Sequence, residues 1–149
     1  MRQIKYIFIN DSMPTAPRGK SSNICVDNFG HHYVANSAGE VLKLIDVCRP
    51  GSFLERETKN LKPRERERLS QCSIGIKYNG SLKHETCNLK QRAALLRLLV
   101  ELRSHFPDAK ILGLTELAPA TRNFEPGTRG VIHPSEAMNQ IRRELSDYP

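Results

Sequence analysis

The sequence is poor in aromatic residues and has no long apolar run. It contains no tryptophan, and aromatic residues make up 6% of its 149 residues. Proteins that bind single-stranded nucleic acid stack successive bases on aromatic side chains, so this shortage argues against an extended surface of that kind. No stretch approaches the roughly 18 consecutive apolar residues of a membrane-spanning helix, and we therefore expect no such helix.

The N-terminal stretch lacks the features of a secretory signal. In MRQIKYIFIND, one charged turn leads directly into a strand pattern, without the apolar core of about 7–15 residues that a signal peptide needs. This predicts a cytoplasmic protein, whose access to a cell wall would require lysis or another export route. Cys25, Cys48, Cys72 and Cys87 form no C-x-x-C pair, so we expect reduced thiols.

The rest of the composition is typical of one globular domain with an excess of positive charge. Hydrophobic residues make up 38% and charged residues 26% of the chain, and the length predicts a single domain over residues 1–149. The net charge of +7 either favours an acidic partner, such as nucleic acid, or serves only solubility. Acidic and basic residues alternate over 55–69, which indicates a solvated segment with a short helix after Pro63 rather than a nucleic-acid stripe.

Five short patterns predict the strands of one sheet. The stretch Ile4–Ile9 is nearly all apolar, as expected of a central strand that is covered on both faces. The stretches His32–Ala35 and Val41–Ile45 flank a turn and indicate a hairpin. Two further strands are predicted in SIGIKYNG, before its Asn-Gly turn, and over Lys110–Leu112.

Two helices complete the predicted fold. Asn88 caps the first helix, with Gln91 three residues later as in a capping box, and Pro107 ends it. A terminal helix starts near Pro134, a residue that suits a first helical position. We therefore predict an α/β fold with a central mixed sheet of about five strands flanked by helices. The apolar face of the first helix comprises Leu89, Ala93, Leu95, Leu96, Leu99, Val100, Leu102 and Phe106.

The order of these elements resembles that of the zinc N-acetylmuramoyl-L-alanine amidases of the phage-lysozyme and peptidoglycan-recognition type. The resemblance covers nearly the whole chain and is strongest in SIGI and in QRAALLRLLVELRSHFPDAKILG, stretches that specify fold more than chemistry. It implies a bacterial or phage protein with a hydrolase fold that acts on the cell wall. The segment between Asn10 and Gly30 is shorter than in that family, which implies that an early helix is missing.

The positions that carry the family's chemistry hold other residues here. The resemblance places the family's two zinc-binding histidines at Asn10 and Leu114, and its third ligand at His133. It places the catalytic tyrosine at His31 in GHHY, and a substrate-side histidine at Phe53 in GSFL. We therefore predict no catalytic residue. The predicted walls of a former cleft that binds a ligand are Asn10, His31, Phe53, Leu114 and His133.

This set of donors argues against zinc. Catalytic zinc takes three nitrogen, sulfur or oxygen ligands and a water, but Leu114 has no lone pair and Asn10 offers only a neutral amide oxygen. One imidazole, from His133, would not hold the metal tightly enough to activate its water. We predict no cofactor, unless Asp11, Glu116 and His133 form an atypical zinc site. Asp11 and Glu116 also fit the role of loop residues, and His133 that of a helix entry.

Three functions follow from these observations and stay open at this point. The first is a pseudoenzyme, an inactive amidase-like protein that binds a peptidoglycan fragment or muropeptide in the former cleft. The second is an active amidase with the atypical zinc site. The third is a basic module that binds a protein or nucleic acid, with a steep salt dependence. Because His31 and His32 are consecutive, only one of them is expected to line the cleft.

Overall fold

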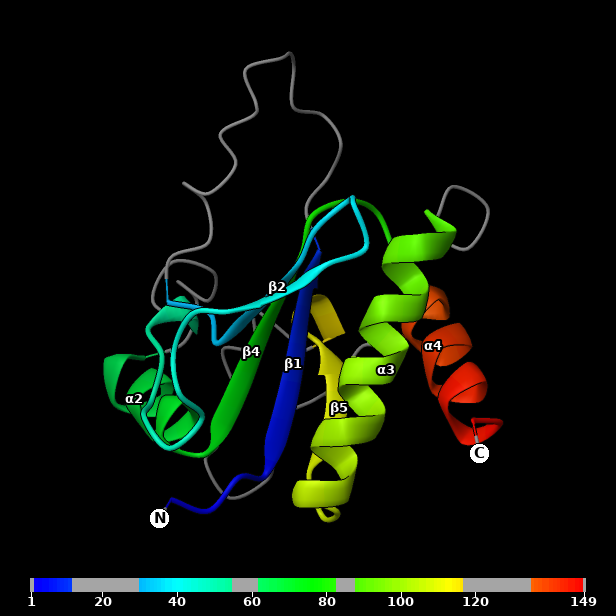
Figure 1. Ribbon diagram of the computed structural model, residues 1–149. Helices are drawn as coiled ribbons and strands as arrows, with labels where there is room; N and C mark the ends of the chain where they lie inside the picture. The colour runs from blue at the N-terminus through cyan, green and yellow to red at the C-terminus, as the bar shows by residue number, and fades with distance from the viewer. Residues whose placement is uncertain (1, 12–29, 55–61, 83–87, 117–134, 149) are drawn as a thin grey trace.

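Figure 1 shows the computed structural model, which describes residues 2–11, 30–54, 62–82, 88–116 and 135–148. Five strands form one sheet in the order β3-β2-β4-β1-β5. The pair β2–β3 is antiparallel and the other pairs are parallel, so the predicted α/β fold with a mixed sheet is confirmed. The strands are β1 (Tyr6–Asp11), β2 (Tyr33–Ala35), β3 (Val41–Lys43), β4 (Ser73–Tyr78) and β5 (Lys110–Gly113).

The central strand β1 contributes apolar side chains to both faces of the sheet. It pairs with β4 and with β5 from Tyr6 onwards, two residues after the predicted start at Ile4. Ile7 and Ile9 point into the main core, whereas Phe8 points to the opposite face. The main core consists of Ile4, Ile7, Ile9, Ala35, Ile74, Ile76, Tyr78, Leu82, Leu95, Leu96, Leu98, Leu99, Leu102, Met138, Ile141 and Leu145.

Helices lie on both faces of the sheet. α3 (Leu89–His105) and α4 (Glu136–Ser146) cover one face and enclose the main core with it (Figure 1). α2 (Pro63–Gln71) begins at the predicted proline, and its Leu69 packs on the other face against a smaller aromatic cluster. Within the described ranges, no helix is long and apolar enough to cross a membrane. The aromatic cluster consists of Phe8, Phe53, Leu54, Leu112 and Leu114.

The cap of α3 is confirmed, but the predicted buried face is wrong in part. The side chain of Asn88 accepts a hydrogen bond from the N–H of Gln91, whose own side chain donates to the carbonyls of Ala35 and Asn79 instead of completing a capping box. Leu89, predicted to be buried, is 76% exposed. Both the sheet and α4 pack against α3, so its buried positions lie on more than one stripe. They are Gln91, Arg92, Ala94, Leu95, Leu96, Leu98, Leu99 and Leu102.

The start of α4 also differs from the prediction. The helix begins at Glu136, while Pro134 lies outside the described residues. The N-cap is Ser135, whose hydroxyl oxygen accepts a hydrogen bond from the N–H of Met138 at 3.2 Å. A serine in this position stabilises a helix because it satisfies an N–H group of the first turn that has no partner within the helix.

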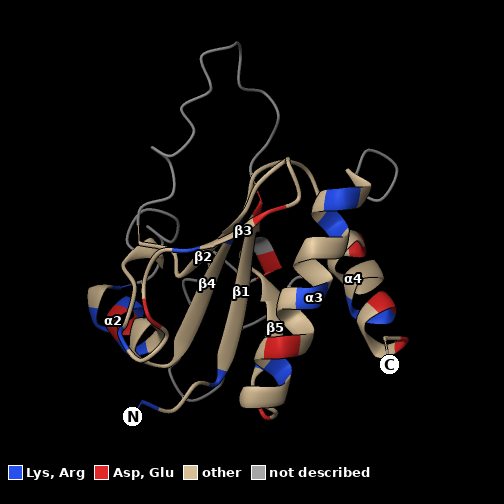
Figure 2. Cartoon of the chain, in the orientation of Figure 1, with Lys and Arg blue, Asp and Glu red and all other residues tan. Residues whose placement is uncertain are grey.

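Charged side chains lie both on the helices and on the segments between them. Figure 2 shows mainly Lys and Arg along α3, where Glu101 is the one acidic residue, whereas α4 carries both signs. The ion pair between Arg92 and Glu144, 2.8 Å long, joins the two helices across their contact. The acidic or nucleic-acid partner suggested by the net charge stays a prediction.

Candidate functional site

Most of the predicted cleft residues gather where the parallel strands end. Asn10 lies near the end of β1, opposite Lys77 of β4. Leu114 directly follows the end of β5, which pairs with β1 on its other side. In open α/β sheets, ligands bind outside the carboxyl ends of the strands. The fifth predicted residue, His133, lies outside the described residues.

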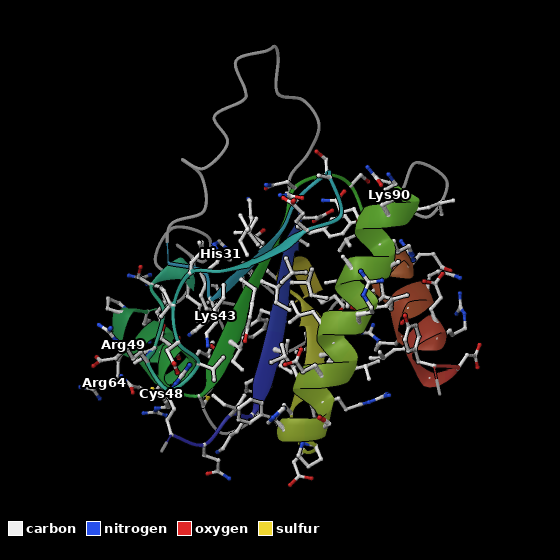
Figure 3. All side chains as sticks on the ribbon, viewed as in Figure 1. His31, Lys43, Cys48, Arg49, Arg64 and Lys90 are labelled. Carbon is white, nitrogen blue, oxygen red and sulfur yellow. The ribbon has the colours of Figure 1, made fainter. Side chains whose placement is uncertain are left out.

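His31 reaches Asn10 from the segment before β2. The amide nitrogen of Asn10 lies 3.4 Å from Nε2 of His31, and both residues are buried. The turn that places His31 here needs a glycine, because Gly30 has a φ of +78° and a Cβ on it would lie 2.6 Å from the backbone nitrogen of Phe53. Figure 3 labels His31 where the chain enters the β2–β3 hairpin.

Phe53 joins the aromatic cluster to these polar groups. Its ring stacks on that of His31, with 5.2 Å between the ring centroids. It lies directly against β4 because Gly75 has no side chain, and a Cβ there would come within 2.6 Å of the ring. Leu114 belongs to the same cluster and is 7% exposed. The structure thus brings Asn10, His31, Phe53 and Leu114 together as buried residues, and their role in binding a ligand stays a prediction.

The neighbouring histidine, His32, has a structural role. Its Nδ1 accepts a hydrogen bond from the N–H of Gly75, and its Nε2 lies 2.7 Å from the carbonyl oxygen of Arg49. This pattern fits a neutral ring with its proton on Nε2. Burial lowers the pKa of His32, the hydrogen bond to Arg49 opposes this, and the nearby guanidinium of Arg2 lowers the pKa further. The folded protein therefore favours the neutral form of the His32 ring.

Glu116 acts as a clamp between η3 (Leu114–Glu116) and α4. Its Oε1 accepts hydrogen bonds from the N–H of Gly113 and from Nη1 of Arg142, at 2.9 and 3.0 Å. Its Oε2 accepts from the N–H of Ser135 and from Nη2 of Arg142, at 3.0 and 2.7 Å. Burial alone would raise the pKa of Glu116, but the hydrogen bonds and the charge of Arg142 lower it on balance. Both carboxylate oxygens are therefore already engaged.

The described side chains at this edge of the sheet do not form a set of zinc ligands. Asn10 contributes a neutral amide, and Leu114 contributes no donor. Of the predicted atypical set, Asp11 accepts a hydrogen bond from the N–H of Leu82. Glu116 already accepts hydrogen bonds from Arg142 and from two backbone N–H groups. Among the residues that the structure describes, no three His, Cys, Asp or Glu side chains are grouped so that they could hold a metal ion.

Lys77 is a residue of this edge that the sequence interpretation did not single out. The main core takes Ile74, Ile76 and Tyr78 from β4, so Gly75 and Lys77 face the opposite side with Phe53. Lys77 is opposite Asn10 in the parallel register and is only 7% exposed. The signal in the sequence is a single charge within the otherwise uncharged SIGIKY strand.

Comparisons with known proteins support the fold. No protein-family model and no curated protein matches the sequence. The structure of this protein is similar to the solved structure of the N-acetylmuramoyl-L-alanine amidase LysC from Clostridium intestinale URNW, with a TM-score of 0.58 and 14% sequence identity. The match covers 97% of this chain and 87% of LysC. At this identity the likeness shows the fold alone: this chain folds as LysC does.

Proposed function

We propose that this protein is a non-hydrolytic protein with an amidase fold, which binds peptidoglycan fragments at the carboxyl ends of β1, β4 and β5. The observation that carries the proposal is the side-chain composition of this edge. Asn10 and Leu114 stand at the two strand ends, and both are packed against buried neighbours. In the amidases that the sequence resembles, these two positions bind zinc.

The absence of hydrolysis follows from the donors at these positions. A metal that activates water needs ligands that are anionic or imidazole-like and free to coordinate. The carboxylate of Glu116, the nearest alternative after Leu114, accepts four hydrogen bonds from protein groups. Its use as a ligand would leave Arg142, 34% exposed in its side chain, without its partner.

The peptidoglycan part of the proposal comes from the position and chemistry of the edge. The similar structure, LysC, is by name an N-acetylmuramoyl-L-alanine amidase. The edge combines an aromatic ring, Phe53, with the amide of Asn10 and the imidazole of His31. Apolar walls with a few polar groups are typical of ligand sites, and amide and imidazole groups can bind the amides and hydroxyls of a muropeptide.

The test is isothermal titration with muramyl dipeptide together with a mass-spectrometric assay for cleavage of muramyl peptides. We expect saturable heat and no cleavage, with or without added zinc. Replacement of Asn10 by alanine removes one polar contact and should weaken binding by about 2–10-fold, the range of a single neutral hydrogen bond.

The matched control is Asn36→Ala. Asn36 lies in the turn between β2 and β3, where its side chain binds only groups of that turn. This variant should bind muramyl dipeptide as the unaltered protein does. No heat with any muramyl peptide at millimolar concentration would refute the binding proposal, and cleavage would refute the non-hydrolytic part.

A further inference from the structure

We propose that Lys77 makes the site selective for ligands with a free carboxylate, so that it prefers N-acetylmuramic acid and its acidic derivatives to neutral sugars. This inference rests on the proposed function and names the chemical group that the same site recognises. It starts from the mostly buried Lys77 on β4, because a basic residue is unusual at such a position.

The position of Lys77 is set by the register of the sheet. β4 lies between β2 and β1, and Lys77 is opposite Val34 on one side and Asn10 on the other. Residues that are opposite each other in neighbouring parallel strands point to the same face. Lys77 and Asn10 therefore share the face on which Phe53 lies over Gly75.

Most of the Lys77 residue is covered by its neighbours. The residue is 7% exposed. Its ammonium has no ion pair or hydrogen bond with any residue that the structure describes, whereas the buried Glu116 and Arg92 are paired with Arg142 and Glu144. The Lys77 ammonium is not among the described buried polar atoms that lack a partner, so it keeps contact with solvent, where an anionic group can reach it. A ligand anion at the strand ends would supply the partner.

The ligand charge that fits is a single carboxylate. One lysine supplies one compact positive charge, without the fork of an arginine or the row of backbone N–H groups that phosphate sites use. The neighbouring Asn10 and His31 add groups that bind amides and hydroxyls, and Phe53 adds an apolar wall. N-acetylmuramic acid presents this combination, since it is N-acetylglucosamine with a lactyl ether that ends in a carboxylate.

The experiment compares these two sugars by isothermal titration. The unaltered protein should bind N-acetylmuramic acid at least about tenfold more tightly than N-acetylglucosamine, as expected of a hydrogen bond to a charged group. Lys77→Met, which keeps most of the length of the side chain and removes its charge, should abolish the preference, and Lys77→Arg should keep most of it. Equal binding of the two sugars by the unaltered protein would overturn the inference.

The control separates local from overall charge. Lys43→Met removes one positive charge from the edge strand β3, where the Lys43 side chain is 55% exposed, and should leave the preference unchanged. A preference that survives in Lys77→Met, or falls equally in Lys43→Met, would contradict the role of Lys77. If muramyl dipeptide binds and the preference is absent, the proposed function stands and this inference fails. If neither sugar nor muramyl dipeptide binds, both fail.

Discussion

The two faces of the sheet are built in different ways. The face beneath α3 and α4 is filled by the main core, whose members are almost all aliphatic and are supplied by strands and helices alike. The opposite face carries a small cluster of two phenylalanines and three leucines, and beside it the buried polar residues Asn10, His31 and Lys77. The first arrangement is what stability requires. The second gathers polar side chains at the strand ends, which is why the proposed site lies on that face.

The largest effect is expected in the main core. Leu99 of α3 is fully buried there, and Leu99→Ala should lower the free energy of unfolding by about 2–5 kcal/mol through lost burial and the cavity left behind. Urea denaturation followed by circular dichroism measures this change. A loss below about 1 kcal/mol would show that the main core is not the principal source of stability.

A slightly smaller effect is expected at the clamp that joins the strand ends to α4. Glu116→Gln removes the charge that pairs with Arg142 and should cost about 2–3 kcal/mol, below the roughly 3–5 kcal/mol of a fully buried pair because Arg142 is partly exposed. Arg143→Gln, which breaks the exposed pair with Glu136 on the same helix, is the matched control and should cost under about 1 kcal/mol. Equal losses in urea denaturation would contradict the clamp.

The contribution of Glu116 to the free energy of unfolding should also depend on pH. The folded protein lowers the pKa of Glu116, so between the folded and unfolded pKa values the unfolded state binds more protons than the folded state. The stability from Glu116 is therefore present above about pH 4.5 and is lost as the pH falls through the folded pKa. Glu116→Gln should flatten this part of the pH–stability curve. An unchanged curve would show that other carboxylates cause the acid sensitivity.

His32 should produce a further loss of stability in weak acid. Its pKa is lowered in the folded protein, chiefly by burial, so below about pH 6.5 the unfolded state takes up a proton that the folded state resists. The free energy of unfolding should fall by at most about 1.4 kcal/mol per pH unit in this range. His32→Asn should remove that slope, whereas His105→Asn, on the exposed end of α3, should leave it in place. A slope that persists in His32→Asn would exclude this residue as its source.

The smallest effect is expected at Leu89. The predicted helical stripe placed it in the core, but it is 76% exposed at the start of α3. Leu89→Ala should change the free energy of unfolding by less than about 0.5 kcal/mol, as is usual for surface substitutions. A loss like that of Leu99→Ala, measured in the same urea experiment, would mean that this end of the helix is covered.

The sequence predicted the main-core side of the molecule better than the side that carries the proposed site. Strand patterns such as SIGIKY and the cap at Asn88 are local signals, and they led to the correct strands and helix. The buried face of α3 was predicted less well because α4, distant in sequence, covers part of it. Leu89, the first residue of α3, is exposed and not part of that face.

The site was predicted in part because its residues come from separate segments. The resemblance led to Asn10, His31, Phe53 and Leu114, which the structure brings together. It gave no indication of the contact between Asn10 and His31, which are 21 residues apart, or of the pair between Glu116 and Arg142, 26 apart. Such pairs depend on how distant elements pack.

The central claim is that the strand-end residues do not hold a catalytic metal. The most direct test is the zinc content of the purified protein by elemental analysis, after incubation with excess zinc and removal of the free ion. The account predicts well under one zinc ion per chain. One tightly bound zinc ion per chain, released when His31 or Glu116 is replaced by alanine, would contradict it.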